Sequence, residues 1–387
     1  MTFITNATDG TKDHPETHNR IHAILNCRVC STETIPNGKE VFDQETLQAA
    51  LTEARNGIPT TIKPGKYLVT QTIELVDAHH VYIDAEGVEI IAAADNLDPV
   101  FRVANIDWGR LTGFQLTTAE GITCKTMLRV VTLENYSHVT TGVHFDGWDI
   151  SGAFNVGVDI GNGGDMPNPN AQCDVIEFRN SRLRGGRTPD QLPDDPKWGI
   201  GWNVRNGSNS LMTSFEKCHG GHCRVYILDG QGVTWNGGSI GVCDIDIQVA
   251  YTGQGAYRDR RGEGIGRSVY TEEGAATYST DLLMDNVDMR CANVPDDRKA
   301  IVWTRNGAIY TRMYTLVQRE TDDPPLIGFS PYVGTSLIAG MRVRSKTAIS
   351  SATEIIAASD ANLVTLSGVV TPQNDSGAQT SKGLVFA

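Results

Sequence analysis

From about Thr60 onward, the chain alternates short apolar segments with small or polar residues that favour turns. The first four apolar segments are TIELV at 72–76, HVYID at 80–84, VEIIA at 88–92 and PVFRV at 99–103. Each is bounded by Asp, Gly, Asn or Ala. Segments this short and this regularly spaced predict β-strands of a coiled solenoid or a sandwich.

One pattern then recurs in register: an apolar pair, an outward residue, one or two turn residues and a second strand. It occurs in VHFDGWDISG (143–152), IEFRNSRLRG (176–185), TSFEKCHGG (213–221), VTWNGGSIG (233–241) and LLMDNVDMRC (282–291). Each coil of a solenoid buries its apolar row against the neighbouring coils, so equivalent side chains form one interior column. That column is Phe145, Phe178, Phe215, Trp235 and Met284. We therefore predict an all-β fold, a right-handed single-stranded parallel β-helix.

The solenoid is preceded by an arm and a capping helix. Residues 1–40 are polar, with His14, His18 and His22 and a short helical stretch at 16–25, and they read as an attachment arm. A capping helix follows over 45–55, with Asp43 as the N-cap and Gly57 as the stop. The β-helix domain then runs over 41–372, and 373–387 forms a C-terminal cap or tail.

Three segments interrupt the repeat and predict surface loops. They are rich in Gly, Pro and charged residues and cover 161–171, 185–197 and 253–266. Loops on a rigid scaffold commonly carry binding residues, which directs attention to the part of the chain around them.

Composition narrows the classes of partner. The formal charge of −13 and pI near 5.1 disfavour nucleic acid or an anionic membrane as a partner. There is no apolar run long enough for membrane insertion, and the first residues lack the pattern of a signal peptide. Most of the eight cysteines fall in or beside the predicted strands, which favours buried free thiols. Cys27 and Cys30 have no second pair to complete a metal site. We expect no cofactor.

Alternation along the strands predicts a polar outer face. If residues such as Val225, Ile227, Ile245 and Ile247 point inward, their neighbours point outward. The predicted outward residues are Asn155, Asp159, Asn203, Arg205, Arg224, Tyr226, Asp244, Asp246 and Gln248. A mixed polar and aromatic face of this kind suits a saccharide, and it is equally typical of a solvated solenoid face.

Glycoside hydrolysis requires two carboxyl groups across a groove, one as general acid and one as nucleophile or base. Asp244 and Asp246 are two residues apart in one strand, and Glu272 and Glu273 follow on the next coil. Glu216 is a further candidate, with Asp149 and Asp229 nearby. The predicted substrate-binding residues are His219, His222, Arg224, Tyr226, Asn203, Arg205, Arg258 and Tyr270.

A polysaccharide lyase would instead need a base and a cation that neutralises a uronate carboxyl group. His219, His222 and the arginines of 257–261 are suitable side chains. The CHGGHC segment also has metal-ligand residue types, but Cys218 and Cys223 fit interior or turn positions better, and no metal is predicted.

The segment VFDQETLQAALTEARNGIPTTIKPGKYLVTQTIEL resembles the opening of the pectate-lyase-like superfamily, where a capping helix precedes a first coil with a P-G-x-Y turn, here Pro64 to Tyr67. That superfamily includes pectate lyases, polygalacturonases, inulin fructotransferases and phage tailspike depolymerases. The paired aspartates of polygalacturonases and the calcium-binding aspartates of pectate lyases are not recognisable here. Residues 17–26 are similar to a segment near the start of tail proteins of phages that infect actinobacteria.

The resemblance implies a homotrimeric tailspike-like protein that binds and cleaves a bacterial surface polysaccharide. It would be located in the virion tail or outside the cell, with residues 1–40 contacting other virion proteins. Two alternatives stay open: a polysaccharide lyase or fructan-type transferase of the same fold, and a non-catalytic receptor-binding or structural tail protein.

Overall fold

The protein is described from a computed structural model. The structure describes residues 40–291 apart from 137, 163–170, 186–197, 206–211, 250–254 and 272–281. Outside that span it describes short strands at 33–34 and between 302 and 385. The predicted helix at 16–25 and most of the predicted arm lie outside the described residues.

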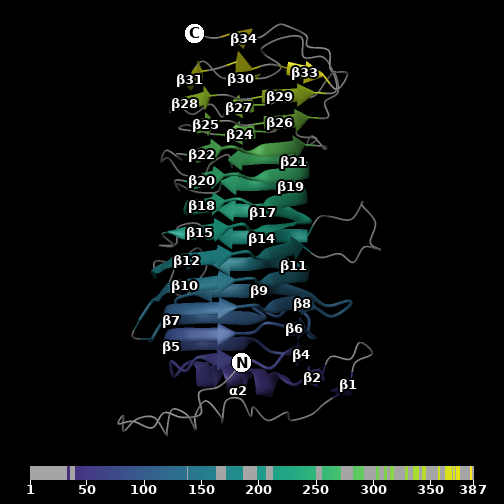
Figure 1. The fold of residues 1–387 in the computed structure, drawn as a ribbon, viewed down its shortest axis with the longest axis vertical. Coiled ribbons are helices and arrows are strands. Elements are labelled where there is room, and N and C mark those ends of the chain that lie inside the picture. Colours follow the sequence, from purple (N-terminus) through teal and green to yellow (C-terminus); the bar gives the residue numbers. More distant parts are fainter. Residues whose placement is uncertain are drawn as a thin grey trace, which may run out of the picture.

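The chain is a right-handed parallel β-helix, as the sequence predicts, with tiers of strands stacked along one axis (Figure 1). Three parallel sheets surround the core, and long strands bend from one sheet into the next. Sheet 1 contains β4 (Gly65–Val69), β6 (Val88–Ala92), β8 (Gln115–Thr118), β13 (Arg182–Gly185), β16 (His219–Gly221), β23 (Asp288–Cys291) and the first parts of β11 (Asp149–Ile160), β19 (Ser239–Val249) and β21 (Arg261–Thr271).

Sheet 2 follows sheet 1 in each coil. It contains the first parts of β5 (Ile73–Asp84) and β7 (Phe101–Thr112), together with β9 (Thr123–Val131), β14 (Trp198–Val204), β17 (Cys223–Asp229) and the second parts of β11, β19 and β21. Sheet 3 contains β3 (Thr60–Thr61), the second parts of β5 and β7, β10 (Thr140–Asp146), β12 (Cys173–Arg179), β15 (Thr213–Glu216), β18 (Val233–Asn236), β20 (Gly255–Arg258) and β22 (Leu282–Asp285).

The same three-sheet stacking continues toward the C-terminus. It does so through β24 (Val302–Thr304), β25 (Ile309–Thr311), β26 (Tyr314–Val317), β27 (Ile327–Phe329), β28 (Gly334–Ala339), β29 (Arg342–Ser345), β30 (Ile356–Ala357), β31 (Asn362–Ser367) and β33 (Pro372–Asn374). Two antiparallel pairs lie at the ends, β1 (Glu33–Thr34) with β2 (Glu40–Phe42), and β32 (Val369–Val370) with β34 (Leu384–Val385).

Helix α2 (Gln44–Ala54) covers the N-terminal end of the solenoid, as Figure 1 shows. The Asp43 side chain accepts a hydrogen bond from the Thr46 amide, which confirms the predicted N-cap. The buried face includes Leu47, Leu51 and Ala54, which join the apolar core of the coils. The helix therefore closes the open end of the core. Among the described residues, no helix is long and apolar enough to cross a membrane.

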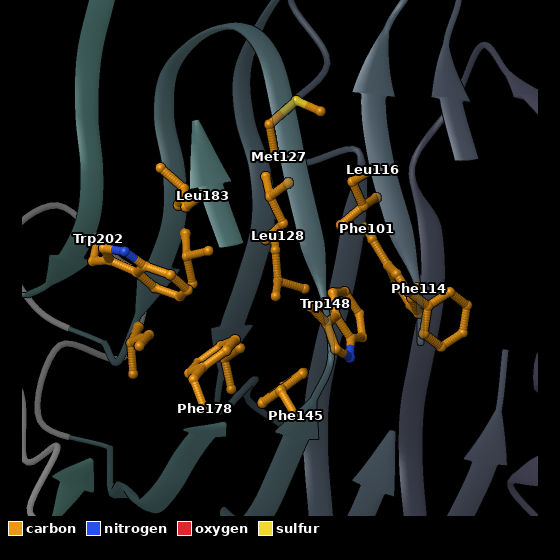
Figure 2. Close-up of a cluster of buried hydrophobic side chains, with 14 of the residues drawn as sticks. Phe101, Phe114, Leu116, Met127, Leu128, Phe145, Trp148, Phe178, Leu183 and Trp202 are labelled. Atoms are coloured by element: carbon orange, nitrogen blue, oxygen red, sulfur yellow. The ribbon is translucent and has the colours of Figure 1, made fainter. Parts of the chain in front are cut away.

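The predicted interior column is confirmed by the strand register. Phe145 pairs with Phe178, Phe178 with Phe215, and Phe215 with Trp235 in successive strands of sheet 3. Phe145 and Phe178 are stacked with ring centroids 4.4 Å apart, and Trp148 and Trp202 pack against this column from the other sides of the core (Figure 2). Aromatic pairs in such geometries add to the apolar burial that holds neighbouring coils together.

One coil was missed by the sequence alignment. Tyr257 lies between Trp235 and Met284 in the column, because β20 pairs with both β18 and β22. The predicted loop at 253–266 is therefore wrong over 255–258 and 261–266, which form β20 and the start of β21. The sequence alignment overlooked this coil because the charged residues of YRDRR interrupt the apolar alternation by which a strand is identified.

The turn from sheet 3 to sheet 1 has the same geometry in seven successive coils. Its first residue has a positive φ in each, a conformation that favours Gly and Asn. These residues are Gly113, Gly147, Asn180, Lys217, Gly237, Asp259 and Asn286. The second residue points inward, as Trp148 and Arg260 do, and is buried where it carries a side chain.

Candidate functional site

The outer face of sheet 3 carries two parallel lines of polar side chains, here called the outer row. Register places Tyr82, Arg110, His144 and Glu177 in one line across neighbouring strands. The second line contains Asp84, Thr112, Asp146, Arg179, Glu216, Asn236 and Arg258. Since neighbouring strands lie about 4.8 Å apart, the row presents a polar group at each coil along a rigid surface.

Two carboxylates of the outer row share one guanidinium. Arg179 Nε lies 2.7 Å from Glu177 Oε1 and 3.6 Å from Glu216 Oε2, so these oxygens are at most about 6.3 Å apart. His144 Nδ1 contacts the other oxygen of Glu177. Retaining glycosidases hold their two carboxyl groups about 5–5.5 Å apart and inverting ones about 6.5–9.5 Å apart, so an upper limit of about 6.3 Å is compatible with the retaining spacing.

A surface hollow lies at the N-terminal end of the outer row. Its volume is about 330 Å³, and it is lined by Tyr82, Arg110, Asp84, Thr112 and the neighbouring segment 59–61. Tyr82 is half-exposed, and Arg110 donates to Asp146 at 2.9 Å. An exposed aromatic ring beside fixed polar groups is the combination found in small-molecule and saccharide pockets.

The sequence-predicted site residues are spread around the solenoid. Glu216 and Arg258 lie on sheet 3, within the outer row. His219 lies on sheet 1. Asn203 and Tyr270 are on sheet 2, with Leu228 and Gln248 between them in the register. The structure therefore does not bring the predicted residues together into one site, because strands of one coil face three directions.

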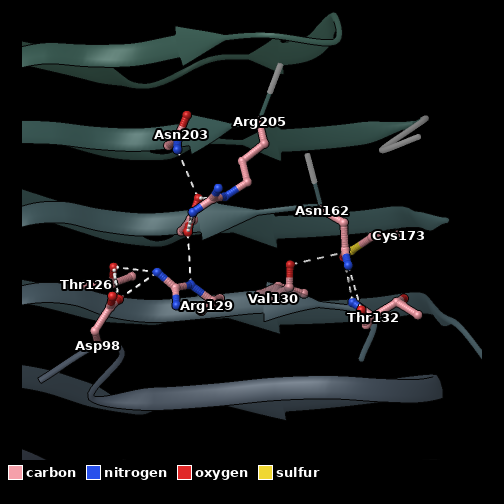
Figure 3. A network of polar contacts seen from close by, with 10 residues as sticks. Asp98, Thr126, Arg129, Val130, Thr132, Asn162, Cys173, Asn203 and Arg205 are labelled. Carbon is pink, nitrogen blue, oxygen red and sulfur yellow. Dashed lines mark hydrogen bonds and ion pairs between the residues drawn. The ribbon is translucent and has the colours of Figure 1, made fainter. Parts of the chain in front are cut away.

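Asn203 and Arg205 are bound to a buried carboxylate. Asp159 is fully buried and accepts hydrogen bonds from Asn203 Nδ2 at 2.9 Å and from Arg205 Nε and Nη2 at 2.8 and 2.7 Å. Arg129 Nε approaches it from the preceding coil at 3.0 Å (Figure 3). Arg129 also contacts Asp98 at 2.6 Å. This network joins successive coils, so its side chains serve structure rather than a free binding face.

Tyr226 and Asp246 were predicted to point outward, and this is wrong. Both side chains are fully buried. They occupy one column at the bend between sheets 1 and 2, where three consecutive residues, 225–227, are buried and alternation fails. The bend turns the chain between the sheets, so a neighbouring pair can both face the core. Neither side chain is placed to contact a polysaccharide.

Asp246 is instead half of a buried ion pair. Arg260 Nη2 donates to Asp246 Oδ1 at 2.7 Å, and both side chains are fully buried. The guanidinium lies over the rings of Trp235 and Tyr257, at 4.9 and 5.3 Å. Burial raises the pKa of Asp246, an effect that the Arg260 charge partly offsets.

His219 is the first residue of β16, and His222 directly follows its last residue. His219 Nδ1 accepts a hydrogen bond from the Ser239 amide at 3.1 Å. Burial, and secondarily the charge of Arg184, lowers the pKa of His222. Cys218 and Cys223 are buried, as predicted, and burial raises the pKa of each thiol to about 12. Within the described parts of the chain, no three His, Cys, Asp or Glu side chains are arranged to hold a metal ion.

Of the remaining predicted site residues, two lie on described strands and two lie outside the described residues. Arg224 is exposed on β17, and Asp244 lies beside it in the register on β19, partly buried. Glu272 and Glu273 lie outside the described residues, and so do the greater parts of the predicted loops at 161–171 and 185–197.

The sequence interpretation missed Tyr82, Arg110, His144, Glu177 and Arg179. A usable signal was present, because His144 and Glu177 immediately precede the aligned column residues Phe145 and Phe178. A residue next to an inward one in a strand points outward. The alignment that found the core therefore also contained the outer row.

Comparisons with known proteins bear on the fold. No protein-family model matches the chain, and the comparison with curated proteins gives no match. Among solved structures, the chain is similar to the Streptococcus pneumoniae surface protein and adhesin PfbA, with 9% identity, 92% of this chain and 98% of that one covered, and a TM-score of 0.50. An endo-xylogalacturonan hydrolase from Aspergillus tubingensis has 10% identity, covers 89% of this chain and 94% of its own, and gives a TM-score of 0.46. At these identities, the similarity to the adhesin is one of fold alone.

Proposed function

We propose that the chain is a tailspike-like protein that binds a bacterial surface polysaccharide along the outer row of sheet 3 and cleaves it as a glycoside hydrolase. The observation that carries this proposal is the carboxylate pair Glu177 and Glu216 around Arg179, on strands of the same sheet as the hollow at Tyr82, from which β10 separates them. In this role one carboxyl group protonates the leaving oxygen, and the other acts as nucleophile or base.

Arg179 has a positioning role in this mechanism. Its guanidinium contacts both carboxylates, and the hydrogen bond to Glu177 raises the pKa of Arg179, which stays charged. One of them must hold a proton to act as the acid, so a bound saccharide has to displace part of this contact. The proposal extends to a homotrimer in a virion tail, which residues 1–40 would attach to other virion proteins.

The test is product formation on a panel of bacterial surface polysaccharides. Hydrolysis releases reducing ends without absorbance near 235 nm, whereas a lyase product absorbs there. We expect Glu177→Gln and Glu216→Gln each to lower the rate by at least about 100-fold, the scale of general acid–base catalysis. Glu74→Gln is the matched control, since Glu74 lies on sheet 2 and pairs with Arg102. Full activity in both row variants would refute this site, and binding without product would indicate a receptor-binding protein.

A second placement of the same reaction uses Asp244 with Glu272 or Glu273. It rests on the sequence and on the position of Asp244 beside the exposed Arg224. The same assay on Asp244→Asn and Glu272→Gln decides between the two placements. Loss of turnover in these variants, with Glu177→Gln unaffected, would place the catalytic site at Asp244.

A further inference from the structure

A half-exposed tryptophan stands at the corner between sheets 2 and 3. Trp108 is 51% exposed and has a φ of +62°, which is unfavourable for a residue with a large side chain. Its ring lies against Gly142, where an added Cβ would come within 2.6 Å of the indole. The same combination of positive φ and exposed apolar side chain occurs at Met212 and Val242, so what distinguishes Trp108 is its large ring and the groups around it.

A second exposed aromatic residue is held in the following connection. Tyr136 is 43% exposed, between β9 and β10. Buried Asn105 fastens this connection: its Nδ2 donates to the carbonyls of Leu133 at 3.2 Å and His138 at 2.7 Å, and its Oδ1 accepts from the Leu133 amide at 3.0 Å. The connection is therefore built into the scaffold on both sides of Tyr136.

Two imidazole–carboxylate contacts lie in the same corner. His79 Nδ1 is 3.1 Å from Asp107 Oδ2, and the His79 ring lies 4.2 Å from that of His138. His138 Nδ1 is 3.8 Å from Asp77, whose other oxygen contacts Arg55 at 3.7 Å. His79 and Asp107 remain exposed enough to meet a ligand, at 57% and 33%.

We infer that this corner, formed by Trp108, Tyr136, His79, Asp107 and His138, is a second saccharide-binding site. A sugar ring has an apolar face that stacks on the indole, and hydroxyls that bond to the Asp107 carboxylate and the His79 imidazole. The choice of a saccharide rests on the proposed function. In β5 and β7, His79 and Asp107 lie three residues before the outer-row residues Tyr82 and Arg110. A longer saccharide bound on the outer row therefore reaches the corner.

The inference is tested by calorimetric titration of the full chain with three hexasaccharides: β-1,4-linked glucose, α-1,4-linked glucose and β-1,4-linked N-acetylglucosamine. For the probe that binds, we expect Trp108→Ala to weaken affinity about tenfold and Asp107→Asn about threefold. Trp108→Phe keeps a ring and should lose less, so it serves if the alanine variant does not fold. Leu68→Ala is the control, an exposed apolar residue on sheet 1.

The possible results separate this site from the proposed function. Unchanged affinity in Trp108→Ala, or no binding of any probe by the wild type, overturns the corner site. A change of sedimentation behaviour in Trp108→Ala without a change of affinity also overturns it, and indicates a contact between copies of the chain. The proposed function fails on a different measurement, when Glu177→Gln and Glu216→Gln leave product release unchanged.

Discussion

Two neighbouring stretches of the β-helix interior solve the same packing problem differently. Between Phe145 and Trp235 the core is a column of stacked aromatic rings, with successive centroids 4.4, 5.7 and 4.5 Å apart. One coil further on, the interior contains the ion pair of Asp246 and Arg260. Arg260 occupies the turn position that holds Phe114 and Trp148 in earlier coils.

The difference shows what a solenoid interior requires. Each coil needs a group that contacts the coils on either side. The phenylalanine rings of the column supply this without hydrogen bonds, and the polar group of Trp235, Nε1, donates to the Gly237 carbonyl at 2.8 Å. In the coil with the ion pair, Arg260 is held by Asp246 and by the rings of Trp235 and Tyr257. Even so, Arg260 Nε and Nη1 and Asp246 Oδ2 have no hydrogen-bond partner within the described structure. Such a pair is costly to desolvate and sensitive to the loss of either member.

The largest effect is expected from breaking the ion pair. Asp246→Ala leaves a buried, unpaired guanidinium, and we expect the free energy of unfolding to fall by about 3–5 kcal/mol. Urea denaturation followed by circular dichroism measures it. The double variant Asp246→Leu with Arg260→Met replaces both charges by apolar groups and should recover most of this loss. A double variant as unstable as the single one would contradict this account of the pair.

A smaller effect is expected in the aromatic column. Phe178 stacks on both Phe145 and Phe215, so Phe178→Leu loses two ring contacts while retaining most of the apolar volume. We expect a loss of about 1–3 kcal/mol in the same denaturation experiment. Leu183→Met, a substitution of similar volume at another buried position, is the control and should cost less. Equal losses in the two variants would mean that ring stacking adds nothing to burial.

The smallest change is expected in pH dependence. Asp229 is buried in the coil before the ion pair and accepts from Tyr257 Oη at 2.7 Å and the Gly232 amide at 2.6 Å. Burial raises the pKa of Asp229 above its ordinary value of 3.8, and the hydrogen bonds that the carboxylate accepts offset only part of this rise. The folded state therefore binds this proton more tightly than the unfolded state does. Its contribution to stability is present below about pH 3.8 and is lost as the pH rises through the folded-state pKa.

Asp229→Asn removes that titration. Relative to the wild type, the variant should gain stability as the pH is raised from about 4 to about 7, measured as the difference between two urea denaturation series. Parallel curves for the two proteins would contradict a raised pKa at this carboxyl group.

Much of the fold was predictable because neighbouring coils repeat one local pattern. The interior column and the capping helix follow from apolar periodicity and from the N-cap Asp43, which depend on residues close in sequence. The relative placement of the predicted site residues was less predictable. Glu216 and Arg258 do lie on the outer row, but His219 and Asn203 face other directions, since sequence distance does not reveal which of three sheets a strand joins.

The sequence alone determined that this protein is a β-helix, which residues stack in its interior, and where its first coil is capped. The tertiary structure decided the rest: that Tyr226 and Asp246 turn inward at a bend, that Tyr257 completes a hidden coil, and that Glu177 and Glu216 meet at Arg179. The physical reason is that strand alternation is a local property, lost wherever the backbone bends between sheets. Contacts between coils join residues about 20–40 positions apart, and only the stacking register brings them together.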